Sequence, residues 1–400
     1  MTGDLPEFQP AAAYTLELPR EPRPIVILGA GGIVRDAHLP AYAKAGFPVL
    51  AIYNRTKARA QALAEQYGIP AVFDDLAETV AAAPANTVFD IALMPEQYAE
   101  TLEALPDGAA VLIQKPFGHT LAQAAELLEI CRRKRLVAAV NTQLRFSPYV
   151  AAARAAIAAG QIGELYDVEV RVQVNTPWEL FPHVLTLDRL EINMHSVHYI
   201  DLLRSFLGDP AGISASTVRH PQKSHANSRS NILFHYPDRD LRVAISTNHD
   251  HHFGERYEES YIKWEGTRGA IRAQMGLLLD YPVGGEDRLE IQLDSAPELG
   301  WRPLDFTGSW FPDAFIGSMG ALQRYLDGSV PTLPTSVEDV YRTMAVVEAA
   351  HAASDSGGLP PDYDAPAAVR SGASVQSAPA TSAVPATSAA PATSAPEGQS

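Results

Sequence analysis

The sequence predicts an α/β protein with an N-terminal doubly wound parallel sheet, followed by a C-terminal α/β domain with a large, open, mostly antiparallel sheet. Three observations lead to this prediction. Short apolar runs alternate with helix-like stretches up to about residue 145, a glycine turn follows the first of these runs, and half-polar runs dominate from residue 166 onward. Alternating strands and helices form parallel sheets covered on both faces. A chain of 400 residues has room for two such domains.

The composition is that of a globular chain whose partners are small molecules. Hydrophobic residues make up 46% of the sequence, and the formal net charge is -16. Binding a phosphate backbone requires a basic face, so the charge argues against a nucleic-acid partner. The single cysteine suits a reducing compartment, and no secretion signal or membrane span is visible. We therefore expect a cytoplasmic protein that binds neither nucleic acid nor membrane.

The first domain is predicted to span residues 23–145, after a proline-rich arm at residues 1–22. Its apolar runs are short and uninterrupted, which is typical of strands buried on both faces. Strands are expected at residues 25–28, 48–53, 71–73, 88–93, 110–113 and 136–140. Helices are expected at residues 57–67, 76–83, 96–105 and 121–134. The order of these elements is that of repeated β-α-β units.

The second domain is predicted to span residues 146–353, and its strands alternate apolar with polar residues. Strands are expected at residues 166–174, 213–218, 231–236, 241–247, 260–264, 270–275 and 289–293, and helices at 149–159, 312–326 and 337–352. An open sheet has a face to cover, so we expect a homo-oligomer, a dimer or a tetramer. Residues 354–400 are rich in Ala, Pro, Ser and Thr and are predicted to be disordered.

The glycine turn after the first strand predicts a Rossmann-type dinucleotide site. Gly29 allows a tight turn, and Gly31 lets the backbone approach a pyrophosphate at the start of the next helix. Gly32 and Ile33 continue the turn, whereas Val34 occupies the position of the third glycine. The match to the fingerprint is therefore partial, but its place between a buried strand and a helix strengthens it.

The end of the second strand favours NADP over NAD. A site for NAD normally offers Asp or Glu to the ribose hydroxyls, but this chain offers Asn54, Arg55, Thr56 and Lys57. Two cationic side chains suit a 2′-phosphate. In the alternative interpretation, Arg55 caps the strand and stacks on adenine in an enzyme that accepts either cofactor.

Two segments carry candidate proton chemistry. Lys115 follows the fifth strand, at the carboxyl edge where parallel sheets bind ligands, and burial there would lower its pKa toward the working range. Residues 191–201 predict a helix with Glu191, His195 and His198 on one face. By itself this polar stripe allows a metal site, an acid-base site or a buried hydrogen-bond network. The histidines of residues 249–252 are neighbours on an extended segment, point to opposite sides and predict no metal site.

Several of these motifs together resemble the glucose-fructose oxidoreductase and inositol 2-dehydrogenase family (Gfo/Idh/MocA). The resemblance extends from about residue 24 to residue 352. It implies a Rossmann domain, an α/β domain often used for oligomerisation, and oxidation or reduction of sugars, polyols or related ring compounds with a pyridine nucleotide. The motifs are the glycine turn, His38-Leu39-Pro40, Met94-Pro95, Gln114-Lys115-Pro116-Phe117, residues 143–148, and His198 followed by Asp201.

The resemblance assigns roles residue by residue. The family's Glu-Lys-Pro is similar to Gln114-Lys115-Pro116, so its lysine maps to Lys115, and its catalytic histidine maps to His198. The family usually has an aspartate four residues before that histidine, where this chain has Met194. Either Glu191 with His195 replaces that carboxylate, or His195 carries the proton and His198 supports it. We favour His198.

The prediction is therefore an NAD(P)-dependent sugar or polyol dehydrogenase that moves a hydride between the nicotinamide and a secondary alcohol or ketone. The alternatives are a glycoside-cleaving enzyme that uses transient oxidation, and a nucleotide-binding sensor or scaffold without turnover. Predicted catalytic residues are Lys115, His198, His195 and Glu191, with no metal. Predicted substrate contacts are Lys115, Arg145, Trp178, His195 and His198. Predicted cofactor contacts are Gly29, Gly31, Gly32, Ile33, Asn54, Arg55, Thr56, Met94, Pro95, Gln114, Lys115 and Asn141.

Overall fold

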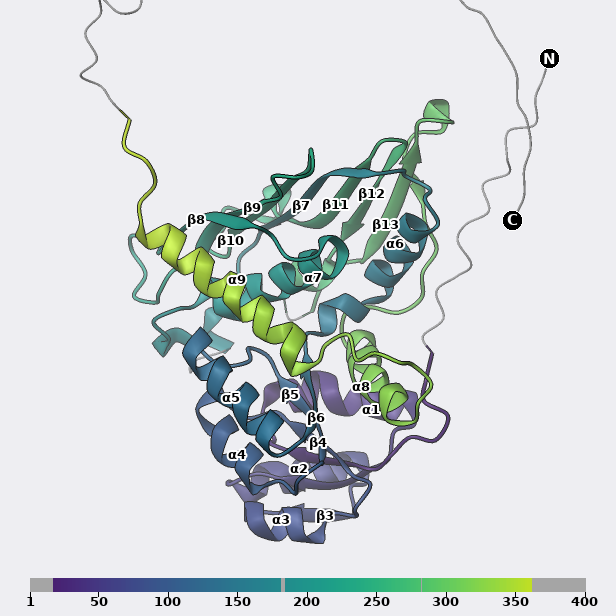
Figure 1. Ribbon diagram of the computed structural model, residues 1–400, viewed down its shortest axis with the longest axis vertical. Coiled ribbons are helices and arrows are strands. Elements are labelled where there is room, and N and C mark those ends of the chain that lie inside the picture. Colours follow the sequence, from purple (N-terminus) through teal and green to yellow (C-terminus); the bar gives the residue numbers. More distant parts are fainter. Residues whose placement is uncertain (1–16, 181–183, 282, 362–400) are drawn as a thin grey trace, which may run out of the picture. The chain divides into compact units, whose positions relative to one another are not determined.

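Two sheets organise the described part of the chain, which comprises residues 17–180, 184–281 and 283–361 of a computed structural model (Figure 1). The first sheet is parallel, and its strand order is β3-β2-β1-β4-β5-β6. The order changes direction between β1 and β4, where open α/β sheets bind ligands beyond the carboxyl ends of their strands. The strands are β1 (Ile25–Leu28), β2 (Val49–Tyr53), β3 (Ala71–Phe73), β4 (Val88–Ile91), β5 (Ala110–Gln114) and β6 (Val137–Asn141).

The helices between these strands cover both faces of the first sheet, as the alternating pattern predicts. Their apolar residues pack with those of the strands in two core clusters, one on each face of the sheet, and every residue of β1 and β4 is buried. The helices are α1 (Leu39–Ala45), α2 (Lys57–Tyr67), α3 (Leu76–Ala82), α4 (Tyr98–Ala104) and α5 (Leu121–Arg133). A π-helical turn, Val34–His38, precedes α1.

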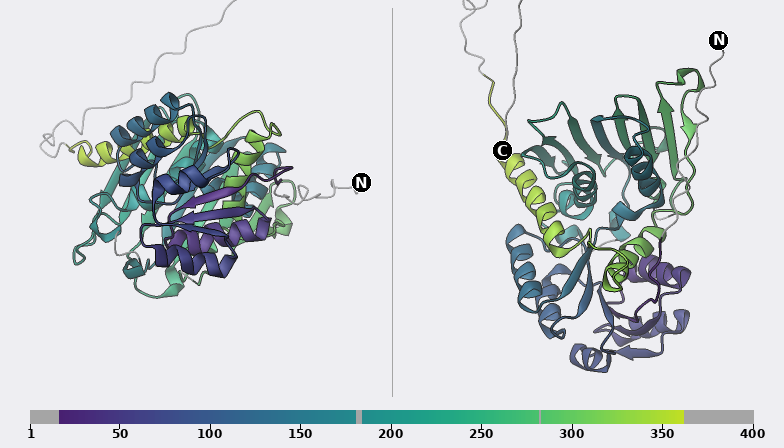
Figure 2. Two further views of the ribbon diagram at one scale, coloured as in Figure 1. Left: turned by 90° about the horizontal axis from the view of Figure 1, so that it is seen from below. Right: turned by 45° about the vertical axis from the view of Figure 1, so that its right-hand side comes forward.

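The second sheet is mostly antiparallel and has the order β14-β13-β12-β11-β7-β10-β9-β8, with β7 and β10 as a parallel pair. Burial alternates along β9 and β11, so one face is packed and the other partly exposed. Figures 1 and 2 show α6 and α7 against the packed face. The strands are β7 (Leu165–Gln173), β8 (Gly212–Val218), β9 (Arg229–His235), β10 (Arg242–Asn248), β11 (Glu259–Gly266), β12 (Gly269–Gln274), β13 (Arg288–Leu293) and β14 (Arg302–Pro303).

The later helices are α6 (Pro148–Ala158), α7 (Val197–Leu207), α8 (Asp313–Leu326) and α9 (Val337–Asp355). The sequence order assigns α8 to the second domain, but the structure packs it against the first sheet. Phe315, Ile316 and Met319 join the core that contains Ile25 and Ile27. The apolar face of α8 fits the surface beside α1, which chain order alone does not reveal.

The two predicted terminal segments lie largely outside the described residues. Within the predicted arm, residues 17–22 are described, and Arg20 donates its backbone N–H to Asp327 at the end of α8. Helix α9 ends at Asp355, close to where the tail is predicted to begin, and residues 362–400 are not described. Among the described helices, none is long and apolar enough to cross a membrane.

Candidate active site

The glycine turn lies between the ends of β1 and β4. Gly29 has a φ of +125°, and a Cβ at this position would collide with the carbonyl oxygen of Ala92, just beyond β4. The backbone N–H of Gly29 donates to Tyr53 O at 2.8 Å, which joins the turn to β2. Only glycine combines this conformation with this close approach. The first position of the fingerprint therefore has a direct steric cause.

The rest of the turn presents an open backbone surface. Gly31 and Gly32 are exposed, and a Cβ on Gly31 would meet nothing within 4 Å. The N–H groups of Val34 and Arg35 both reach Gly31 O at 3.2 Å, so a helical turn starts here. Ile33 is half-buried, whereas Val34 is fully buried and fills the core where the fingerprint expects glycine. This arrangement fits a dinucleotide pyrophosphate at a helix start.

The segment after β2 contains a structural residue, Asn54, and an exposed cation, Arg55. Asn54 Oδ1 accepts from the N–H of Ala30 at 3.2 Å, and Asn54 Nδ2 donates to Thr56 O at 3.0 Å. The Asn54 side chain therefore holds the glycine turn against the end of β2. Arg55 and Thr56 are exposed, and Lys57 Nζ lies 3.3 Å from Asp74. Arg55 is thus an exposed cation at the end of β2.

The remaining predicted cofactor residues follow β4, β5 and β6 at the same edge of the sheet. Met94 is half-buried and Pro95 is buried after β4. Gln114 ends β5 and Asn141 ends β6, and both side chains are buried. Because the strands are parallel, their carboxyl ends lie along one line that starts at the glycine turn.

The side chain of Lys115 extends from the end of β5 to the segment around Met194 in the second domain. Its Nζ donates to the backbone carbonyl of Met194 at 2.8 Å, and burial lowers the pKa of its amine to about 8. The family resemblance expects an aspartate side chain at position 194. In this chain the lysine is held instead by the neutral carbonyl of that same residue. An amine without a carboxylate partner is more readily deprotonated.

The predicted helix at residues 191–201 is interrupted by a π-helical turn at Ile192–Ser196, and α7 begins at Val197. The wider turn shifts the register of the predicted face, and His249 lies against both Glu191 and His195. Glu191 accepts from Ser196 Oγ at 2.7 Å and lies 3.7 Å from His249 Nε2. Glu191 therefore faces His249, whereas Lys115 is bound by the carbonyl of Met194.

The carboxyl of Glu191 is fully buried and ionised. Burial tends to raise its pKa, but His249 and the hydroxyls of Ser230 and Ser196 outweigh this effect and lower it. A buried carboxylate is stable only when such donors surround it. Glu191 consequently belongs to the environment of His249, and its predicted role as a substitute for the absent aspartate is not supported by these contacts.

His195 and His198 lie on either side of the π-to-α transition in two aromatic environments. His195 stacks on His249 with ring centroids 4.1 Å apart and meets the edge of Trp178 at 5.4 Å. His198 packs edge-on against Trp310 at 5.8 Å. Burial lowers the pKa of both histidines well below the ordinary value, and Lys115 contributes to both shifts. Both imidazoles are thus neutral at pH 7 and can accept a proton.

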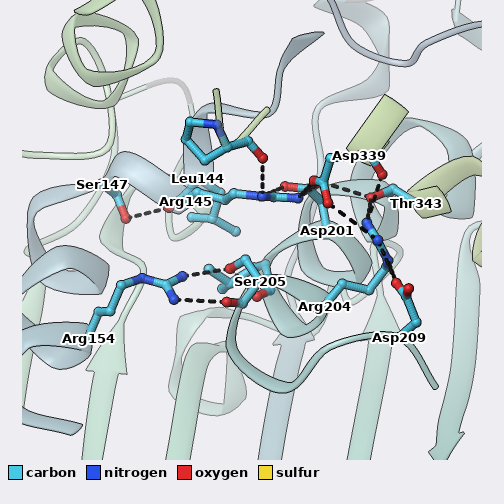
Figure 3. A network of polar contacts seen from close by, with 12 residues as sticks. Leu144, Arg145, Ser147, Arg154, Asp201, Arg204, Ser205, Asp209, Asp339 and Thr343 are labelled. Carbon is cyan, nitrogen blue, oxygen red and sulfur yellow. Dashed lines mark hydrogen bonds and ion pairs between the residues drawn. The ribbon is translucent and has the colours of Figure 1, made fainter. Parts of the chain in front are cut away.

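Two predicted substrate residues have structural environments. Arg145 pairs with both carboxylate oxygens of Asp201, with Asp339 at 2.5 Å and with Pro334 O at 2.8 Å (Figure 3). These contacts engage the guanidinium of Arg145 and make it a structural residue, in place of the predicted substrate contact. Trp178 is only 5% exposed and packs among the histidine rings, so it supports His195 from the side.

Sequence reasoning missed His249 as a member of this site. Its Nδ1 lies 2.8 Å from Thr176 Oγ1, directly beyond the paired ends of β7 and β10. The signal available was its position after a predicted strand, but no local pattern revealed the pairing of β10 with β7. Among the described residues, no group of three or more His, Cys, Asp or Glu side chains is arranged to hold a metal ion.

The strand order, the open glycine turn at its switch point and the facing lysine and histidines define a dinucleotide-binding oxidoreductase. The model of the oxidoreductase family with an NAD-binding Rossmann fold matches residues 23–142, and that of the GFO/IDH/MocA C-terminal domain matches residues 150–272. The chain belongs to the Gfo/Idh/MocA oxidoreductase family.

Curated relatives match the chain at low identity. A D-apiose dehydrogenase of Paraburkholderia graminis is 24% identical over 83% of this chain and 87% of its own length. A D-glucoside 3-dehydrogenase of Escherichia coli is 28% identical over 48% of this chain and 55% of its own length. A levoglucosan dehydrogenase structure in complex with NADH and levoglucosan has a TM-score of 0.69, with 16% identity, and covers 84% of this chain and 98% of its own. The structural similarity supports the fold.

Proposed function

We propose that this protein oxidises a secondary hydroxyl of a sugar, polyol or glycoside, or reduces the corresponding ketone, with NADP as the preferred cofactor. The observation that carries the proposal is the bond from Lys115 Nζ to Met194 O. It brings the amine from the edge that carries the glycine turn to the segment that bears His195 and His198. Relatives named as D-apiose and D-glucoside dehydrogenases support the substrate class.

The cofactor would be held by the glycine turn at Gly29 and Gly31 and by Arg55, and its nicotinamide supplies the hydride chemistry. The chain itself must manage the hydroxyl proton. In our proposal His198 accepts that proton and Lys115 hydrogen-bonds the same oxygen. The family resemblance maps the catalytic histidine to His198, whereas His195 stacks on His249 and meets the edge of Trp178. We therefore assign proton transfer to His198 and substrate binding to His195.

The two histidines are expected to differ when substituted. His198→Asn should lower kcat by about 10² to 10⁴-fold, the usual contribution of a general base. His195→Asn should mainly raise KM for the substrate, because in our proposal its ring, which lies beside Trp178, binds the substrate. Steady-state kinetics of both variants make the comparison, and His235→Asn, an exposed histidine on β9, is the control. A larger kcat loss for His195→Asn would transfer the proton role to His195.

The cofactor preference is expected to depend on Arg55. The wild-type enzyme should show a lower KM for NADP than for NAD. Arg55→Ala should raise KM for NADP roughly 10-fold or more, since a charge-assisted hydrogen bond contributes about 1.5–3 kcal/mol. KM for NAD should change little, and Arg59→Ala, an exposed arginine on α2, provides a matched control. A clear wild-type preference for NAD would contradict the assignment and favour adenine stacking by Arg55.

A substrate screen tests the function itself. Sugars, inositols and glycosides are offered with NAD and with NADP, and net reduction of the cofactor is followed by absorbance. A dehydrogenase reduces the cofactor in proportion to the substrate consumed. Cleavage of a glycoside without net reduction would instead indicate transient oxidation, because the hydride then returns to the substrate.

A further inference from the structure

A buried chain of hydrogen bonds, which the proposed mechanism does not use, ends at the backbone of Lys115. Gln114 Oε1 accepts from the N–H of Lys115 at 2.7 Å, and Gln114 Nε2 lies 3.0 Å from His38 Nε2. His38 Nδ1 lies 2.7 Å from Asp90 Oδ2. His38 and Asp90 are completely buried, and Gln114 is 6% exposed. Side chains from the π-helical turn before α1, from β4 and from β5 therefore connect in line to the residue that carries the reactive amine.

Hydrogen-bond polarity fixes the orientation of each group in this chain. The backbone N–H of Lys115 can only donate, so the side-chain oxygen of Gln114 faces it. The NH2 group of Gln114 then faces His38 and donates to His38 Nε2. This ring nitrogen is consequently unprotonated, and the imidazole carries its proton on Nδ1, where Asp90 accepts it. His38 is thus a neutral imidazole in one defined tautomer.

Two neighbouring groups support this polarity. The Tyr42 hydroxyl donates to the same oxygen of Asp90 at 2.8 Å, and burial together with Asp90 raises the pKa of Tyr42 well above its ordinary value. The hydroxyl therefore stays protonated and remains a donor. Asn141 Nδ2 lies 3.4 Å from His38 Nε2, which places a second amide group beside the unprotonated nitrogen.

We propose that His38 is a positioning residue for Lys115. By accepting at Nε2, His38 keeps the Gln114 amide turned so that its oxygen holds the backbone of Lys115. A proton on His38 Nε2 would face the NH2 of Gln114, and a flipped amide would oppose the N–H of Lys115 with another donor. A glutamate at position 114 could accept a hydrogen bond from the N–H of Lys115 and also from a protonated Nε2 of His38. The amide of Gln114 can hold both partners only when Nε2 of His38 is unprotonated.

The consequence for catalysis follows from the two anchors of Lys115. One is its backbone N–H, held through Gln114, and the other is its Nζ, which donates to Met194 O. Together they fix both ends of the side chain relative to the sheet edge and the second domain. A displacement of about 1 Å at such a group can cost on the order of 10²-fold in rate. The inference rests on the proposed role of Lys115.

Two substitutions of His38 separate its two ring nitrogens. In His38→Gln an amide oxygen can stand near the position of Nε2 and accept from Gln114. In His38→Asn an amide NH2 can replace Nδ1 and donate to Asp90, but nothing accepts from Gln114. We expect His38→Asn to lower kcat by about 10 to 100-fold, with the Kd for NADP and the Tm close to wild type. His38→Gln should restore most of the rate.

A double variant tests whether His38 acts through Gln114. Gln114→Leu removes both hydrogen bonds of the amide, so adding His38→Asn should cause no further loss of kcat. If the kcat losses of the two single variants multiplied in the double variant, the inference would be overturned. It would also be overturned if His38→Asn kept wild-type kcat, or if His38→Gln lost as much kcat as His38→Asn.

Nitrogen NMR of the histidine rings supplies a readout that is independent of turnover. The wild-type protein should show His38 neutral and protonated at Nδ1, with the resonance assigned by its loss in His38→Gln. A proton on Nε2 would overturn the inference even where His38→Asn fails to fold. Full turnover by Lys115→Ala would instead refute the proposed function and leave this spectrum unchanged, which distinguishes the two failures.

Discussion

Lys115→Ala is expected to lower kcat by about 10² to 10⁴-fold while leaving the Kd for NADP largely intact. The substitution removes the amine that we place on the reacting hydroxyl, but it leaves the glycine turn around Gly29 and the exposed Arg55 unchanged. Steady-state turnover and fluorescence titration with NADPH measure the two quantities separately. Lys44→Ala, at an exposed lysine on α1, is the matched control. Wild-type turnover by Lys115→Ala would defeat the assignment.

The same lysine predicts a pH dependence of oxidation. Burial lowers its pKa to about 8 from an ordinary value of 10.5, so the amine is mostly charged at pH 7 and becomes neutral as the pH rises through 8. Because the positive charge of Lys115 helps to lower the pKa of His198, loss of that charge makes His198 a stronger proton acceptor, so kcat for oxidation should increase across this range. Lys115→Arg keeps a positive charge throughout and should flatten the limb near pH 8. If kcat still increased through pH 8 in Lys115→Arg as in the wild type, the pH dependence would belong to another titrating group.

Asp201→Ala is expected to destabilise the protein by about 3–5 kcal/mol, because it leaves a buried guanidinium without its main partner. Asp201 is completely buried and pairs with Arg145, and it also accepts from Thr343 Oγ1 at 2.9 Å (Figure 3). Burial tends to lower the pKa of Arg145, but Asp201 and Asp339 outweigh it and raise the pKa, so the arginine stays charged. Urea unfolding of the variant measures the loss.

An exposed ion pair provides the control for this prediction. Glu286 pairs with Arg288, and their side chains are 69% and 58% exposed, so Glu286→Ala should cost at most about 1 kcal/mol. The double variant Arg145→Met with Asp201→Leu should recover much of the stability, since it removes both buried charges. Equal losses for Asp201→Ala and Glu286→Ala would show that the buried pair contributes no more to stability than an exposed pair.

The network around Asp201 also explains the spacing of the His-x-x-Asp motif. Arg145 follows β6, Asp201 lies on α7, and Asp339 lies on α9, so the ion pairs join three separate segments. His198 lies about one turn before Asp201 on the same helix. In our proposal the histidine performs the chemistry, while the aspartate fixes the helix that carries it. Arg204 extends the network by donating to Thr343 Oγ1 at 2.7 Å.

The strands and most helices could be predicted because their signals are local. The strand at residues 25–28 and the helix at 57–67 occur as predicted, since apolar runs and periodic patterns depend on neighbouring residues alone. The π-helical turn at Ile192–Ser196 was not predictable in this way. Its residues are of the same types as those of an ordinary helix, so no local pattern marks it. Its contacts are with distant residues, because Lys115 bonds the carbonyl of Met194 and His249 lies 3.7 Å from the adjacent Glu191.

The sequence by itself determined the family, both sheets and the glycine turn, and it marked Lys115 as a candidate catalytic residue, because these follow from local patterns at fixed spacing. Only the tertiary structure decided what each polar group contacts. It directs Lys115 to the carbonyl of Met194, turns Glu191 toward His249, and commits Arg145 to Asp201. The physical reason is that hydrogen bonds and ion pairs between distant segments depend on how the two sheets and their helices pack, which no local pattern encodes.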